Sequence, residues 1–204
     1  MRAAGPAGGW GPQARGERYE KAPPAEARLQ FVIMSRPVRR PPLGVVLVAL
    51  VMLALGETAG AAMSRLKPEI QRYAAARVTA NAGAHGFSGS AEYDDEVRDR
   101  AIFTAEAGLS FFHLHAEGVG LVLFFASTLV AATLPWRRAR AALYLLLTLG
   151  GLFPLGYLVY GAAVLEIGRD AGIDLAERWF LTPLGVSAIV GLLGLLFVAA
   201  RRRA

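Results

Sequence analysis

The sequence predicts an all-α integral membrane protein, built as a four-helix bundle with both termini on the cytoplasmic side. Two observations predict the membrane class: 54% of the 204 residues are hydrophobic, and four apolar stretches approach the roughly 20 residues that a helix needs to cross a bilayer. A third observation, the placement of arginine beside these stretches, predicts the orientation. The predicted spans are residues 43–63, 107–134, 141–165 and 180–200.

Three arginine clusters flank the predicted spans. They precede the first span, separate the second from the third, and follow the fourth, so that four crossings place all three on one side. The positive-inside rule assigns that side to the cytoplasm. The acidic connection at residues 166–179 then lies outside. The clusters are Arg36, Arg39 and Arg40; Arg137, Arg138 and Arg140; and Arg201, Arg202 and Arg203.

The N-terminal region leaves two alternatives open. Residues 1–42 form a basic tail rich in proline, glycine and alanine, which predicts disorder, and Met34 offers an alternative start. From Met34 the sequence also fits a cleaved signal peptide, with an apolar core of about 14 residues. We favour a retained span because apolar residues continue to Met63, and because Gly56 and Gly60 have the spacing that lets helices approach closely.

Residues 64–106 form an extracytoplasmic loop in this topology. Residues 66–80 have the pattern of a short amphipathic helix, and residues 91–108 have that of a helix running into the second span. The turn-rich sequence NAGAHGFSGS separates the two. A segment of this length is too short to bury the core of an independent enzyme domain.

Several functional classes are excluded by composition. The chain contains no cysteine, which excludes disulfides, thiolate metal sites and cysteine nucleophiles. The net charge of +6 arises from arginines beside apolar segments, a pattern that indicates membrane topology and not a nucleic-acid partner. The expected partners are the lipid bilayer and other membrane subunits or a second copy of the chain. We do not expect an enzyme acting alone.

The sequence SFFHLHAEG, at the start of the second span, supplies the candidate ligands His113, His115 and Glu117. Residues two apart on an α-helix diverge by about 200°, so the two histidines should point to opposite faces. His113 and Glu117 are four apart and share a face. Helix-edge groups of this kind also occur as solvated residues at the headgroup level, which is the alternative interpretation. Polar groups expected at the same depth are Glu57, Tyr157, Tyr160 and Thr182.

The element HLHAEGVG resembles the HxHxxxxG element of short four-helix bacterial membrane proteins related to the large subunit of haem–copper oxidases. The matching residues are His113, His115 and Gly120. The resemblance implies haem as a cofactor, since opposed histidines on one helix can ligate different haems. Two departures stand against the pattern, Leu121 in place of tryptophan and Leu147 in place of a histidine on the third span. A second axial ligand would then have to come from His85, a partner subunit or a symmetric dimer, unless the iron is five-coordinate.

These observations predict a multi-pass protein of the bacterial inner membrane that binds haem or a metal ion and associates with a respiratory or redox assembly. The sequence alone does not identify the cofactor. One alternative is a structural or assembly subunit without a cofactor. A second is a small proton or metal-ion transporter, although transporters usually place ionisable groups near the midplane and show internal repeats.

Overall fold

The computed structural model describes residues 39–201. The alternative start at Met34 and most of the predicted tail, residues 1–42, lie outside the described residues. Every regular element in the described range is a helix, which confirms the predicted all-α class. The helices are α2 (Leu43–Arg65), α3 (Lys67–Ala80), α4 (Ala91–Thr133), α5 (Arg137–Gly151), α6 (Leu155–Ile167), α7 (Arg169–Ala176), the π-helical turn η1 (Glu177–Leu181) and α8 (Thr182–Arg201).

Four helical segments of the described chain are long and apolar enough to cross a membrane, the number that the sequence predicts. They are α2, α4, α5 with α6, and α7 with η1 and α8. The longest, α4, has 43 residues and therefore extends about 65 Å at 1.5 Å per residue. This is about twice the roughly 30 Å thickness of a bilayer hydrocarbon core, so α4 is long enough to reach well beyond it.

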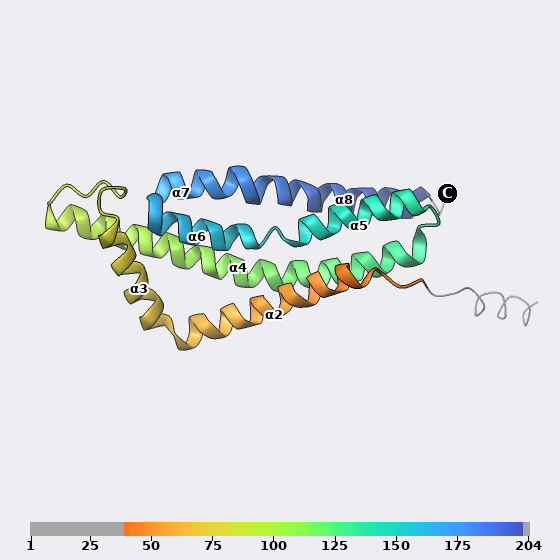
Figure 1. The fold of residues 1–204 in the computed structure, drawn as a ribbon, viewed down its shortest axis with the longest axis horizontal. Coiled ribbons are helices and arrows are strands. Elements are labelled where there is room, and N and C mark those ends of the chain that lie inside the picture. The colour runs from red at the N-terminus through yellow and green to blue at the C-terminus, as the bar shows by residue number, and fades with distance from the viewer. Residues whose placement is uncertain (1–38, 202–204) are drawn as a thin grey trace, which may run out of the picture. The chain divides into compact units, whose positions relative to one another are not determined.

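Helix α4 is the centre of the bundle (Figure 1). It packs against α2 along one side and against α5 and α6 along the other, while α8 lies mainly on α5. Three buried apolar clusters follow its length. They include Val130 with Leu143 and Leu195, Ala116 with Met52 and Phe112, and Ala101 with Val78 and Val164.

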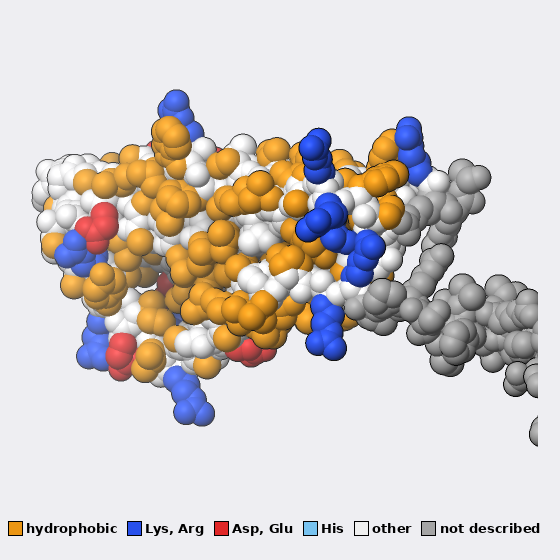
Figure 2. Space-filling model, turned by 45° about the vertical axis from the view of Figure 1, so that its right-hand side comes forward, with side chains coloured by type: hydrophobic (Ala, Val, Ile, Leu, Met, Phe, Trp, Pro, Cys, Tyr) orange, Lys and Arg blue, Asp and Glu red, His pale blue; other side chains and the backbone are white. Residues whose placement is uncertain are grey.

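The two ends of the bundle differ in composition. We call one the arginine end, defined by Arg39, Arg40, Arg137, Arg138, Arg140 and Arg201, and the other the loop end, defined by α3, the turn at residues 81–90 and α7 (Figure 1). On the face shown in Figure 2, hydrophobic side chains cover the middle, and lysine and arginine side chains lie toward the ends. This distribution is the one that a membrane-spanning bundle requires.

The third predicted span is interrupted at Pro154. Helix α5 ends at Gly151, and α6 begins at Leu155 after three residues without regular α-helix. Proline has no N–H to donate and its ring clashes with the preceding turn. The carbonyl oxygen of Gly150 accepts from the Phe153 N–H at 3.1 Å instead.

The connection between the third and fourth spans is almost entirely helical. Gly168 is the single residue between α6 and α7, and its φ of +91° lies in the region that glycine tolerates best. A Cβ at this position would lie 2.4 Å from the carbonyl oxygen of Ala84. The backbone of the 81–90 turn thus packs directly on the reversal from α6 to α7.

Polar contacts hold α3 and its following turn to the end of α6. The Arg77 guanidinium donates two hydrogen bonds to the Glu166 carboxylate, one of them from Nε at 2.7 Å. This partnership raises the pKa of Arg77. The Asn81 side-chain amide donates to the Leu165 carbonyl at 3.1 Å, which satisfies one of the carbonyls that a helix C-terminus leaves unpaired. The predicted helix before the turn is therefore present, and it is separated from α2 by Leu66.

Candidate histidine site

His113 lies on the face of α4 that packs against α2. Its Nδ1 is 3.0 Å from the Gly56 carbonyl oxygen and 2.9 Å from Oε1 of Glu117. The side chains of His113 and Glu117 are 27% and 31% exposed, so both are largely removed from solvent and lipid. The pairing predicted from their spacing of four residues is confirmed.

The two oxygens around Nδ1 define the state of the imidazole. A carbonyl and a carboxylate only accept hydrogen bonds, so Nδ1 carries a proton. In the neutral ring, Nε2 then has its lone pair available. A carbonyl or carboxylate on the far nitrogen is the arrangement that orients metal-ligating histidines and raises their basicity. The site therefore presents an oriented imidazole.

Glycines on α2 make room for this imidazole. A Cβ at Gly60 would lie 2.6 Å from Cε1 of His113, and a Cβ at Gly56 would lie 3.0 Å from Cγ of Glu117. The small-residue spacing predicted to mediate helix approach thus lies directly against the His113–Glu117 pair. The opposing surface of α4 includes Gly120, where a Cβ would lie 3.0 Å from the Ala49 carbonyl oxygen.

His113 opens onto a cavity of about 340 Å³ between the loop-end half of α2, the start of α3, and α4. The cavity brings three kinds of donor atom together: the His113 imidazole, the Glu106 carboxylate and the Met63 thioether. Ser110 Oγ donates to Met63 Sδ at 3.6 Å. Lys67 also lines the space and supplies a positive charge.

His115 lies on the opposite side of α4, as the helical geometry predicts. Its Nδ1 is 2.8 Å from the Phe111 carbonyl oxygen, within its own helix. The ring packs among aromatic side chains, with centroids 4.9 Å from Tyr157 and 5.4 Å from Phe153. His115 thus contacts the interruption of the third span, while His113 contacts the first span.

Comparisons with protein-family models, curated proteins and solved structures found no match to this chain. Its function is therefore inferred from geometry.

The four polar residues predicted at the depth of the histidines are not gathered around one centre. Tyr157 contacts His115, and Tyr160 neighbours Tyr157 with ring centroids 6.5 Å apart. Glu57 and Thr182 are exposed, and within residues 39–201 no hydrogen bond or ion pair joins either to a histidine. His85 lines a different cavity, at the loop end, where its Nε2 is 3.2 Å from the Leu165 carbonyl oxygen.

Two residues of the His113 cavity were not selected from the sequence. Glu106 precedes His113 by seven residues, which is two helical turns, so the pattern i, i+7, i+11 with Glu117 could have identified it. Met63 lies at the end of the preceding span, and no local sequence pattern identifies it as a residue of this cavity. Within the described residues, no three histidine, cysteine, aspartate or glutamate side chains form a complete metal-ligand group.

Proposed function

We propose that the chain is a multi-pass membrane protein that binds a transition-metal ion, or the iron of haem, through Nε2 of His113. One observation carries the proposal: Nδ1 of His113 is held by the Gly56 carbonyl and the Glu117 carboxylate, which leaves Nε2 as the ligand atom. The cavity beside it supplies further donors in Met63 and Glu106.

The donor chemistry fits an iron-containing cofactor as well as a free ion. The His113 imidazole and the Met63 thioether would be the residues that hold haem iron here, and a thioether ligand would raise its reduction potential. Met63 thus offers a second ligand at this cavity. The other histidines, His85 and His115, do not line it. When bound, such a group would supply electron transfer, which is the basis for proposing association with a redox assembly of the bacterial inner membrane.

The test is the visible spectrum and metal content of the full chain purified in mild detergent, oxidised and then reduced with dithionite. We expect a stoichiometric metal, or a haem band that sharpens on reduction. His113→Ala should remove it, and Glu117→Gln should weaken binding about tenfold, the lower end of the usual effect of an outer-shell partner.

His115→Ala is the matched control, because His115 belongs to a separate aromatic cluster on the other face of the same helix. It should retain the bound group. A purified protein without metal or haem, also after reconstitution with haem or with Fe, Cu and Zn salts, would contradict the proposal. If His115→Ala lost the bound metal or haem while His113→Ala retained it, the binding site would lie on the opposite face of α4.

A structural role is the second candidate, and a specific contact favours it. The His113 ring packs on Gly60 and its Nδ1 donates to the α2 backbone, so the residue also joins two spans. In a purely structural protein, His113→Ala would lower the thermal midpoint of unfolding while the wild-type protein contains no metal or haem.

A further inference from the structure

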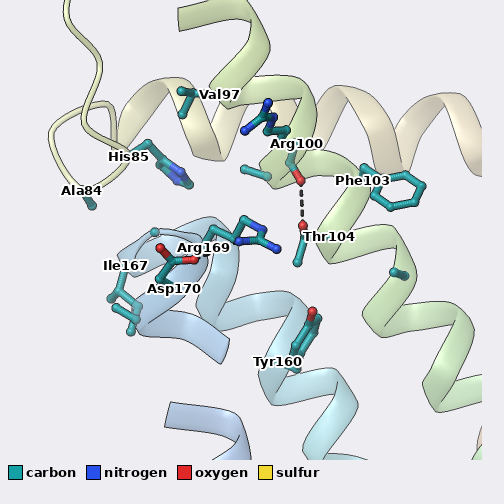
Figure 3. A pocket seen from close by; sticks show the side chains of 14 residues that line it. Ala84, His85, Val97, Arg100, Phe103, Thr104, Tyr160, Ile167, Arg169 and Asp170 are labelled. Carbon is teal, nitrogen blue, oxygen red and sulfur yellow. Dashed lines mark hydrogen bonds and ion pairs between the residues drawn. The ribbon is translucent and has the colours of Figure 1, made fainter. Parts of the chain in front are cut away.

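The loop end contains a second cavity, of about 710 Å³, that is separate from the His113 site. It lies between the outer half of α4, the end of α6, the first turn of α7 and the 81–90 turn (Figure 3). Figure 3 shows Arg100 and Arg169 on different helices beside this space, with the Tyr160 hydroxyl directed toward Thr104. Side chains distant in sequence thus converge on one space.

The lining carries an excess of positive charge. Arg100 and Arg169 both line the cavity, and Asp170 is the one acidic residue among the lining side chains. Each arginine has one terminal nitrogen in an ion pair, Arg100 with Glu96 and Arg169 with Asp170. A guanidinium has five N–H donors, so both retain donors for a further anion.

The ion pairs that already involve these arginines are weak competitors. The Glu96 side chain is 59% exposed and the Asp170 side chain 91% exposed. Exposed pairs contribute on the order of 0–1 kcal/mol, because water screens them and two long side chains must be ordered. Phosphate oxygens match the guanidinium fork in a bidentate manner. A phosphate that contacts both arginines can therefore exchange with these carboxylates.

The rim of the cavity is apolar. Phe103 is 72% exposed and Ile167 is 42% exposed, although both border a cationic space. Arg100 ends the charged run of α4, and the apolar part of the helix begins just beyond it. Cationic groups above exposed aromatic and aliphatic side chains are typical of the level where a membrane meets water. The surroundings therefore suit a ligand that has both a phosphate and an apolar part.

We propose that this cavity binds the phosphate group of an anionic ester through Arg100 and Arg169, with Phe103 and Ile167 contacting the adjoining apolar part of the ligand. Two sources share this chemistry, a phospholipid headgroup at the outer membrane surface and a soluble phosphate. The proposal does not depend on a cofactor at His113, because no residue lines both cavities.

The experiment uses the full chain in an uncharged detergent and measures binding by calorimetry at low ionic strength. The probes are dihexanoyl phosphatidylglycerol, inorganic phosphate, and dihexanoylglycerol, which lacks the phosphate. We expect the first probe to bind and the third not to bind. Competition by inorganic phosphate at similar concentration assigns the site to a soluble phosphate, and failure to compete assigns it to a lipid.

Variants locate the site. Arg100→Gln and Arg169→Gln should each weaken binding about tenfold, which corresponds to the loss of roughly 1.4 kcal/mol. Arg98→Gln is the matched control, because Arg98 lies on the same helix, pairs with Asp95, and does not line this cavity. Phe103→Ala preserves the charge and should weaken lipid binding more than phosphate binding.

The proposal is overturned if neither phosphate probe binds, if dihexanoylglycerol binds as well as the phospholipid, or if the Arg100→Gln, Arg169→Gln double variant binds undiminished. A helical circular dichroism spectrum identical to that of the Arg98→Gln protein shows that the variants are folded. Loss of binding in Arg98→Gln equal to that in Arg100→Gln would also overturn the assignment to this cavity.

Discussion

His113 illustrates how much one side chain's chemistry depends on a residue that has no side chain at all. The imidazole occupies the volume that Gly60 leaves open, and its Nδ1 reaches the carbonyl of Gly56 one turn earlier. A helix surface with larger residues would hold α2 farther from α4. The orientation of the imidazole is therefore a property of the α2–α4 interface.

This dependence gives a prediction for Gly60→Ala. The added Cβ would lie 2.6 Å from Cε1 of His113, so the imidazole must rotate or the helices must separate. We expect reduced binding of metal or haem, and a loss of stability of about 1–3 kcal/mol, as for other overpacked interiors. Metal content and a thermal unfolding curve measure the two effects.

Gly44→Ala provides the comparison on the same helix, since a Cβ there would meet nothing within 4 Å. It should leave both measurements unchanged or slightly raise stability, because alanine favours helix over glycine. Equal behaviour of the two variants would show that the His113 ring does not depend on the space at Gly60.

At the residue scale, the sequence predicts contacts between residues close together on one helix, but not contacts between different helices. The His113–Glu117 pair and the opposed direction of His115 follow from helical geometry, and both are confirmed. The acceptor of the Nδ1 proton, Gly56, lies 57 residues away, and no period relates the two positions. Glu57 was expected near the histidines by depth alone, but depth does not define which side of a helix a residue occupies.

Among the helices, the reversal between α6 and α7 has the strictest backbone requirement. Gly168 combines a φ of +91° with a neighbouring carbonyl, that of Ala84, at 2.4 Å from where a Cβ would lie. We predict that Gly168→Ala destabilises the protein by about 1–3 kcal/mol from backbone strain, with an added cost from displacing the 81–90 turn. Unfolding by sodium dodecyl sulfate in mixed micelles measures the change.

Gly83→Ala serves as the control within the turn itself, where a Cβ would meet nothing within 4 Å and φ is not positive. Its stability should match that of the wild type within a few tenths of a kcal/mol. If Gly168→Ala were equally neutral, the α6–α7 reversal would have to tolerate a different backbone conformation.

The helices that are easiest to predict from the sequence are those defined by hydropathy and length. The four apolar segments follow from the sequence because the composition and length of each segment define it locally. The helical structure of residues 169–179 does not follow from the sequence, since the charges there favour an exposed connection. The end of α6 is capped by Asn81 and paired with Arg77 across more than 80 residues, which no local pattern reveals.

For the whole molecule, the arginine end and the loop end lead to a prediction of orientation. The chain contains no cysteine, so single cysteines report position without background. On sealed spheroplasts, a membrane-impermeant maleimide should label Ser90→Cys, at the exposed start of α4. It should label Arg138→Cys, at the exposed start of α5, only after the membrane is opened.

This pattern is expected because arginine-rich connections remain on the cytoplasmic side. Labelling of Arg138→Cys but not Ser90→Cys in sealed spheroplasts would invert the topology and move both cavities to the cytoplasmic half. Labelling of both positions in sealed preparations would contradict a membrane-spanning bundle.

The position of the His113 cavity along the chain has a consequence for biogenesis. Its lining residues, together with Gly56 and Glu117, all lie between residues 56 and 117. They belong to the first two apolar segments and the connection between them, which are synthesised before α5 to α8. The glycine-lined face of α2 can pack against α4 as soon as α4 has been synthesised. The His113 cavity can thus assemble on a helical hairpin, and the second half of the protein would then pack against a cavity that is already formed.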